Sequence, residues 1–368
     1  MAKLSICIIA NNEEKIIESG ILSILPAADE IIFVDTGCTD STPEIMAKYT
    51  DKIYKYTWID DFSDAYNFAH SKASHEYAIA WNADYVIDKE SANLLIENKT
   101  RNFDGANVVN LRWNNELSST GEPLMWVYKP FIIKPKEIEY YYPDHSQPRA
   151  RDGKVLQSVT YPNIAINESS ERRDKSIVQQ RKQETIARVK KFLSQNPDDI
   201  FMREIYVEEL FFCEYYIQAA IEAEKCLELE TQKQESIFEI LMVEKLILSL
   251  LATQDIEKAQ NVYQKYISKF AQRPEFILIR ADLLTLTDLN LAKEAYLEFL
   301  QKRDLPGFHN QEQHRSQVHP YLMLAKIALS QADIEAAIEY FETAKKIVLV
   351  EKYADEIDIY LNHLKTFA

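Results

Sequence analysis

The chain has 368 residues, of which 46% are hydrophobic and 27% charged, a composition typical of packed domains and a length sufficient for two. Its 42 lysines and arginines stand against 58 aspartates and glutamates, a formal charge of −16 that disfavours nucleic acid and anionic membranes as partners. No apolar run approaches the roughly 20 residues of a transmembrane segment, and the first residues do not read as a secretion signal. The four cysteines have neither metal-site spacing nor disulfide density. We therefore expect a reduced, cytoplasmic protein.

Glycine is scarce, with six in the whole chain. Phosphate-binding loops need glycines where the backbone approaches the ligand closely, and neither GxGxxG nor GxxxxGK occurs. The sequence therefore excludes the dinucleotide-binding and P-loop classes of enzyme.

Up to about residue 165, short apolar runs alternate with stretches of helical periodicity. Strands are predicted at Lys3–Ile9, Glu30–Thr36, Lys52–Trp58 and Tyr77–Asp84, with two more near Asn107–Trp113 and Trp126–Ile133. Helices are predicted at Asn12–Leu25, Ser41–Tyr49 and Phe62–Ala73. This alternation predicts an α/β domain with a mainly parallel sheet flanked by helices.

Polar segments follow each of the first four predicted strands. They are Ala10–Glu13, Asp35–Asp40, Ile59–Asp61 and Asn82–Tyr85. In sheets of this kind the ligand lies beyond the carboxyl ends of the strands. We therefore expect these four segments to form one shared site.

From about Ser176 the chain reads as nearly all helix, with a small residue recurring ahead of larger ones. The leading alanines are Ala220, Ala259, Ala292 and Ala337, at spacings of 39, 33 and 45 residues, and the widest gap contains a polar insertion at Arg303–Pro320. A period near 34 is typical of the tetratricopeptide helix pair, in which a small residue lets paired helices approach. A generic helical bundle is the alternative.

Four motifs in the first half occur in a telling order. They are ANNEE at Ala10–Glu14, VDTGCTD at Val34–Asp40, DFSDAYN at Asp61–Asn67 and NADY at Asn82–Tyr85. They resemble the KNEE, VDTGSTD, DFSxARN and DADE motifs of family-2 glycosyltransferases, which have the nucleotide-sugar fold called GT-A, and the resemblance covers roughly residues 3–165. The similar subgroup carries tetratricopeptide repeats after the catalytic domain. We therefore expect a GT-A-like domain at residues 1–170 and a helical repeat domain at 171–368.

The resemblance implies a uridine diphosphate sugar as the donor substrate. In the family, the loop after the first strand and an aspartate after the second hold the uracil and ribose. The positions that match are Ala10, Asn12, Glu13 and Asp35, with Asn67 and Asn82 from the later motifs. Asp35 can also act as a charge before the next helix, and Asn12 and Glu13 can be ordinary first-turn residues.

The last motif implies a divalent cation, Mn²⁺ or Mg²⁺, that bridges the donor phosphates. Only Asp84 remains of the family's acidic pair, since Asn82 replaces the first acid and supplies no charge. Asp84 is therefore the predicted metal ligand of a degenerate DxD motif. The alternative is a turn-forming aspartate at the end of a strand.

The catalytic base is predicted in EYYYPDHSQP, Glu139–Pro148. By resemblance His145 matches the family's histidine, and Ser146 stands where a glutamate is expected. An inverting transfer needs a group that takes the acceptor's proton, and Asp144 and His145 are the candidates. An exposed loop histidine without a role is the alternative.

Two functions from different classes remain open. The first is a metal-assisted, inverting glycosyltransferase that acts on a protein, peptide or cell-surface acceptor, with the repeats holding a protein or peptide. The second is a pseudo-glycosyltransferase that serves as a protein-binding scaffold. The scaffold interpretation depends on five departures from the motifs, all of which remove charge or catalytic groups: Asn11, Tyr66, Asn82, Tyr85 and Ser146.

Overall fold

The computed structural model describes residues 2–117, 123–168, 175–229, 237–303, 314–349 and 351–364. The chain divides into two compact units, of which the first contains Met1–Leu117 and Met125–Arg181 and the second continues from Lys182. No helix within the described ranges combines the length and apolarity that crossing a membrane requires.

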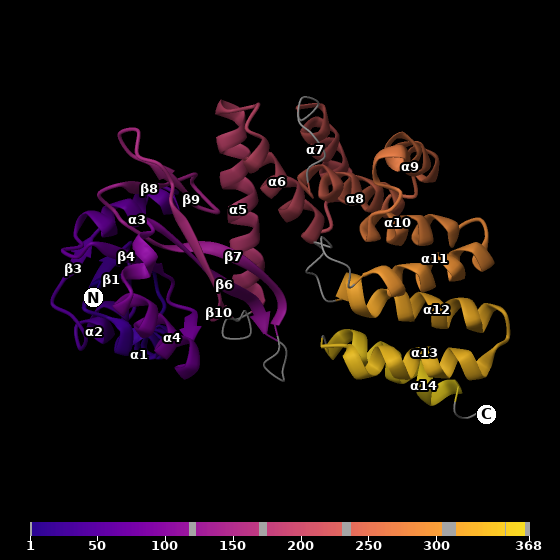
Figure 1. Cartoon of the computed structure of the whole chain (residues 1–368), viewed down its shortest axis with the longest axis horizontal. Coiled ribbons are helices and arrows are strands. Elements are labelled where there is room, and N and C mark those ends of the chain that lie inside the picture. The colour runs from indigo at the N-terminus through magenta and orange to yellow at the C-terminus, as the bar shows by residue number, and fades with distance from the viewer. Residues whose placement is uncertain are drawn as a thin grey trace. The chain divides into compact units, whose positions relative to one another are not determined.

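The first unit is built on an eight-stranded mixed sheet with the strand order β3-β2-β1-β4-β7-β6-β10-β5 (Figure 1). Strands β3, β2, β1 and β4 are parallel, as the alternating pattern predicted, while β7 runs antiparallel to β4 and β5 antiparallel to β10. The strand bounds are β1 Leu4–Ala10, β2 Glu30–Asp35, β3 Ile53–Lys55, β4 Tyr77–Trp81, β5 Tyr85–Ile87, β6 Val108–Leu117, β7 Pro123–Ile133 and β10 Ser158–Glu168. A separate hairpin pairs β8 Ile138–Tyr141 with β9 Gln147–Ala150.

Both faces of the sheet are covered. One face packs against α1 (Ile17–Ile24), α2 (Thr42–Met46) and α4 (Lys89–Thr100), and the other against α3 (Phe62–Ser71) and the β8–β9 hairpin. Short 3₁₀ turns at Leu25–Ala27 and Asn102–Gly105 follow α1 and α4. All seven residues of β1 are buried for this reason, since successive side chains enter opposite layers.

Several elements differ from their predicted extent: β3 is three residues long where Lys52–Trp58 was predicted, and α2 is shorter than Ser41–Tyr49. The predicted strand Tyr77–Asp84 divides into β4 and β5, because the chain turns at Asn82 and Tyr85 N–H donates to its carbonyl oxygen at 3.1 Å. The helix predicted from Asn12 begins only at Ile17, because Asn12 has a φ of 57°, which an α-helix does not accommodate.

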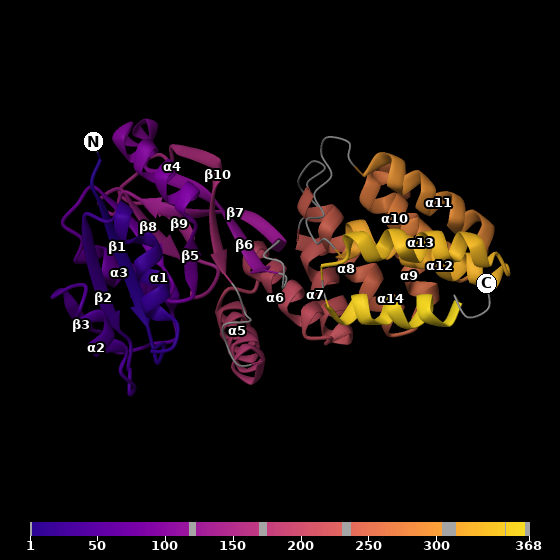
Figure 2. The same ribbon diagram turned by 90° about the horizontal axis from the view of Figure 1, so that it is seen from below.

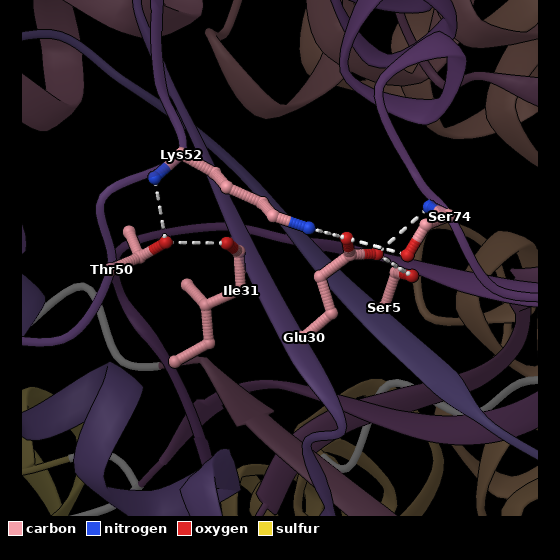
Figure 3. A network of polar contacts seen from close by, with 6 residues as sticks. All are labelled: Ser5, Glu30, Ile31, Thr50, Lys52 and Ser74. Atoms are coloured by element: carbon pink, nitrogen blue, oxygen red, sulfur yellow. Dashed lines mark hydrogen bonds and ion pairs between the residues drawn. The ribbon is translucent and has the colours of Figure 1, made fainter.

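Glu30 ties four segments together at the amino-terminal edge of the sheet (Figure 3). Its carboxylate accepts hydrogen bonds from the Ser5 hydroxyl and the Lys52 ammonium group, and from the backbone N–H and hydroxyl of Ser74 at 2.9 and 2.8 Å. Burial alone would raise the pKa of Glu30, but these donors outweigh burial and lower the pKa to about 2. The carboxylate therefore stays ionised and holds β1, β2 and the segments before β3 and β4 in register.

The second unit is a succession of helices in which, from α6 onwards, each packs against the next (Figures 1 and 2). Their bounds are α5 Lys175–Gln195, which begins in the first unit, α6 Ile200–Phe212, α7 Tyr216–Leu229, α8 Ile237–Ala252, α9 Ile256–Phe270, α10 Pro274–Leu284, α11 Leu289–Lys302, a π-helical turn His314–Val318, α12 His319–Ser330, α13 Ile334–Ile347 and α14 Glu351–Leu364. The four alanines of the predicted repeat lie on α7, α9, α11 and α13, and all are buried. Of the predicted insertion, residues 304–313 lie outside the described residues.

Aspartates begin several of these helices. Asp199, Asp255 and Asp333 each accept a hydrogen bond from a backbone N–H three residues later, and Asp288 caps α11 in the same manner. Such caps satisfy N–H groups that have no partner within the helix. The recurring aspartate thus sets where α6, α9, α11 and α13 start.

Candidate functional site

The loops that follow β1 and β2 are tied to each other at the carboxyl edge of the sheet. Oδ1 of Asn12 accepts hydrogen bonds from the backbone N–H groups of Thr39 and Asp40 at 2.7 and 3.2 Å. In return, Oδ2 of Asp40 accepts from the N–H of Glu14 at 3.1 Å. Asn12 itself is exposed, and its predicted contact with the donor would add to this bridging role.

Asp35 is the last residue of β2 and lies at this carboxyl edge of the sheet. Its Oδ1 accepts hydrogen bonds from the N–H groups of Gly37 and Cys38 at 2.9 and 2.7 Å, a turn that Gly37 permits with a φ of 121°. Burial alone would raise the pKa of Asp35, but these backbone donors outweigh it and hold the pKa below its ordinary value. Next to it lies the buried Ala10, whose carbonyl oxygen accepts from the N–H and hydroxyl of Thr36.

Glu13 is buried and makes an ion pair that the sequence did not reveal. Its Oε1 lies 2.5 Å from Nη2 of Arg181, the last residue of the first unit, and its N–H donates to the Thr42 hydroxyl at 2.8 Å. Arg181 is 168 positions away in the sequence, so no local pattern predicts this pair. The arginine brings a positive charge to the loop for which a nucleotide role was predicted.

Residues of the third motif, DFSDAYN, hold the loop that carries the predicted catalytic base. Asp61 caps α3 by accepting from Asp64 N–H at 2.9 Å. The Ser63 hydroxyl donates to the carbonyl oxygen of Tyr142 at 2.5 Å and contacts the Ser146 hydroxyl at 2.7 Å. The loop between β8 and β9 is therefore fastened to the start of α3.

Asn67 fastens the strand before that loop. Its Nδ2 donates to the carbonyl oxygen of Tyr140 at 2.8 Å, and its Oδ1 accepts from Tyr140 N–H at 2.9 Å. These two hydrogen bonds resemble those between paired β-strands, and they hold β8 against α3. The structure thus engages both polar groups of Asn67 in scaffolding, while its predicted contact with the donor stays a prediction.

Asp144 and His145 lie in the loop held in this way. Both are half-buried, and Oδ1 of Asp144 accepts from His145 N–H at 2.9 Å. His145 has a φ of 48°, in the left-handed region. The backbone of this segment is therefore specific in shape, as a positioned catalytic loop requires, and their role as base stays a prediction.

The degenerate motif occupies the turn between β4 and β5. Oδ1 of Asn82 accepts a hydrogen bond from the hydroxyl of Tyr66, and Asp84 is completely buried. Tyr85 is also buried and packs edge to face on Trp81 and Phe131, with ring centres 5.7 and 5.6 Å apart. The replacements in this motif thus have defined partners within the domain.

Lys129 on β7 is a charged residue of the site that the sequence reasoning missed. Its Nζ lies 3.1 Å from the centre of the Trp113 ring. Burial lowers the pKa of Lys129 to about 8, against the opposing effect of the carboxylates of Glu168, Asp144 and Asp84. A lone lysine in the apolar segment Trp126–Ile133 was the available signal.

Glu168, at the end of β10, is the second residue that was missed. Its Oε2 accepts a hydrogen bond from Nε1 of Trp113 at 3.0 Å, and its backbone pairs with Tyr85. Carboxylates from three separate segments thus raise the pKa of one ammonium group, against the effect of burial. Among the residues that the structure describes, no three His, Cys, Asp or Glu side chains come together as a metal-binding group.

The comparison with protein families agrees with this geometry. Residues 5–170 match the model described as glycosyl transferase family 2. A TPR repeat-containing protein of Synechococcus elongatus is 34% identical over 91 residues, which are 25% of this chain and 23% of that protein. The match thus spans less than a quarter of that curated relative.

The chain is also similar to several solved structures. A tetratricopeptide repeat protein of Parabacteroides merdae is 15% identical, with coverage of 51% of this chain and 66% of that one and a TM-score of 0.40. TarS 1-349 of S. aureus is 13% identical, covering 91% and 89%, with a TM-score of 0.35. Glucosyl-3-phosphoglycerate synthase of Mycobacterium tuberculosis, in complex with Mn²⁺ and UDP-glucose, is 21% identical, covering 30% and 44%, with a TM-score of 0.27. These values carry no conclusion about activity.

Proposed function

We propose that this protein is a glycosyltransferase that moves a sugar from a uridine diphosphate sugar to a protein, peptide or cell-surface acceptor with inversion at the anomeric carbon. The observation that carries the proposal is the family-2 domain at residues 5–170, whose motif loops lie at the carboxyl edge of the parallel strands. Asp35, Asn12 and Glu13 are the proposed contacts of the nucleoside, since all three lie in the two tied loops.

The transfer makes one bond and breaks another. The acceptor's oxygen or sulfur attacks the anomeric carbon, and the bond from that carbon to the phosphate oxygen breaks, with its electron pair leaving on uridine diphosphate. The acceptor's proton passes to Asp144 or His145. Attack on the face opposite the leaving group inverts the configuration. The leaving diphosphate needs a positive charge, which either a divalent cation at Asp84 or a side chain of the protein supplies.

The helical repeats are the proposed binding surface for the acceptor. Four exposed apolar side chains gather on α6 and α7 and the turn between them: Phe212, Tyr215, Ile217 and Ile221. Exposed apolar groups of this kind are common at protein-binding surfaces. The working domain boundary remains residue 170, and a cytoplasmic location is proposed from the four free cysteines.

The scaffold alternative loses part of its support in the structure. Tyr66 and Asn82 contact each other, Tyr85 fills the core, and Ser146 bonds to Ser63. Replacements that fit into packed contacts are accommodated changes, and they do not by themselves remove a donor site. The scaffold is therefore kept as the outcome to which a negative binding experiment would lead.

Calorimetric titration of uridine diphosphate into the full chain tests the proposal. The expected result is micromolar binding that falls about 10-fold or more in Asp35→Asn, because a charged acceptor is replaced by a neutral one of the same shape. The matched control is Asp51→Asn, which removes an exposed carboxylate between α2 and β3 and should change nothing. Absence of binding by the wild-type chain to uridine and other nucleoside diphosphates would overturn the proposal.

A further inference from the structure

We propose that the ammonium group of Lys129 takes the place of a divalent cation in this site, so that donor binding needs no metal ion. The inference rests on the proposed function and concerns how the same site neutralises the diphosphate. It follows from the position of Lys129, from the charges around it and from the poor fit of the remaining residues to a metal.

The pairing of β4 with β7 brings Lys129 level with the degenerate motif. Ala78 lies opposite Ile133 and Ile79 opposite Ile132. The two strands run antiparallel, so Lys129, which precedes these partners on β7, lies towards the carboxyl end of β4, where the Asn82–Tyr85 turn follows. The lysine thus lies beside the turn where the family's acidic pair would hold its ion.

The charges around Lys129 are those that a bound cation would meet. The carboxylates of Glu168, Asp144 and Asp84 all act on its ammonium group. These acids come from the end of β10, the β8–β9 loop and the β4–β5 turn, which are distant in sequence. The ammonium group of Lys129 therefore lies in the field of negative charges from three separate segments, as a bound cation would.

The lysine is also held in its position. Its Nζ lies over the Trp113 ring, and the indole Nε1 of Trp113 donates to Glu168. Trp113 thus contacts the cation with its face and one of the carboxylates with its edge. The ring on which the ammonium group lies is thus itself held by Glu168, so the group is positioned before a diphosphate binds.

The residues that remain do not fit a divalent ion. Asn82 supplies no charge, and its Oδ1 already accepts a hydrogen bond from the hydroxyl group of Tyr66. Asp84 is the single acid left in the motif, and within the described ranges no three potential ligands of the His, Cys, Asp and Glu type form a cluster. A divalent ion beside Lys129 would also be repelled by the ammonium group. The chemistry of this set favours the lysine over the metal.

The test removes the ammonium group and asks whether a metal ion can replace it. Uridine diphosphate is titrated into wild type, Lys129→Ala and Lys129→Arg, each with EDTA and with Mn²⁺, and Mn²⁺ alone is titrated into each. Wild type and Lys129→Arg should bind the nucleotide equally with and without metal. Lys129→Ala with EDTA should bind about 10- to 100-fold more weakly, and Mn²⁺ should restore binding because the ammonium group no longer repels an ion from this place.

The outcomes separate this inference from the proposed function. Nucleotide binding by wild type that requires Mn²⁺ would overturn the role of Lys129 and leave the glycosyltransferase standing. No nucleotide binding by wild type in either condition would overturn the proposed function, and the titration with Mn²⁺ alone would then decide the lysine. A gain of Mn²⁺ binding in Lys129→Ala supports its place as the cation, and no gain overturns it. Lys134→Met, one residue beyond the end of β7 and paired with Glu76 at 2.9 Å, is the matched control and should match wild type throughout.

Discussion

The hydroxyl group of Tyr66 donates a hydrogen bond to Oδ1 of Asn82, so two residues that depart from the family motifs contact each other. The resemblance puts an arginine and an aspartate at these two positions. Two positions that carry charges in the family motifs are thus joined here by a neutral hydrogen bond. The two departures are one coupled change between α3 and the β4–β5 turn.

This coupling predicts the stability of single and double variants. Tyr66→Arg should destabilise the domain by about 2–4 kcal/mol, because it buries a cation opposite a neutral amide. Adding Asn82→Asp should recover a large part of that loss, because the new carboxylate can form an ion pair with the new guanidinium group. Urea unfolding of both single variants and the double variant measures the coupling. Tyr66→Phe is the milder control at about 1 kcal/mol, and strictly additive effects would contradict the coupling.

The Glu30 network predicts a pH dependence of stability. The pKa of Glu30 is lowered from 4.5 to about 2 in the folded chain, so its ionised form stabilises the fold above pH 4.5. This contribution should be lost as the pH falls from about 4.5 towards 2. Unfolding of wild type and Glu30→Gln, measured across this range, should show a stability difference that is largest at neutral pH and shrinks in acid. A difference that does not change with pH would mean that the carboxylate's charge is not what stabilises the edge.

A buried ionic network predicts that Arg315 is critical to the repeats. Its guanidinium group lies 2.7 Å from Oδ2 of Asp282 and 3.2 Å from Oε1 of Glu244, joining α8, α10 and the turn before α12. All three side chains are almost entirely buried. Arg315→Met should cost about 3–5 kcal/mol, since it leaves two carboxylates buried without their cation.

Thermal unfolding of the full chain measures this loss. The control is Lys345→Met, which breaks the exposed pair with Asp358 and should cost less than about 1 kcal/mol. If Arg315→Met were no more harmful than Lys345→Met, the network would not stabilise the repeats.

The close approach of α1 to the β4–β5 turn at Gly20 predicts that a larger residue at this position destabilises the domain. A Cβ atom at this position would lie 2.6 Å from the carbonyl oxygen of Ala83 and 3.0 Å from that of Tyr85. Both atoms belong to the backbone, so neither can swing aside. Gly20→Ala should therefore destabilise the domain by about 1–3 kcal/mol, although alanine is the better helix former.

Chemical unfolding of Gly20→Ala measures this cost, with Ser19→Ala on the exposed side of the same helix as the control. Ser19→Ala should lie within about 0.5 kcal/mol of wild type. An equally stable Gly20→Ala would show that the turn carrying Asp84 yields to α1.

The sequence by itself determined the architecture and the edge of the sheet where the site lies. Strand and helix periods are local, so β1, β2 and α3 lie close to their predicted ranges, and the alanines of the repeat pattern, among them Ala220 and Ala337, are buried on helices. The motif order likewise predicted the family-2 domain at residues 5–170. These features depend on neighbours within a few residues, which one sequence displays.

Only the tertiary structure decided which side chains meet at that edge. Lys129 and Glu168 enter the site through β7 and β10, and Asn67 acts on the β8 backbone across 73 positions. In the sequence, Tyr66 and Asn82 are two separate departures from the motifs. The structure shows that they contact each other, because α3 packs against the turn after β4. The physical reason is that pairing and packing join segments distant in the chain, and a single sequence carries the period of each strand but not the identity of its partner.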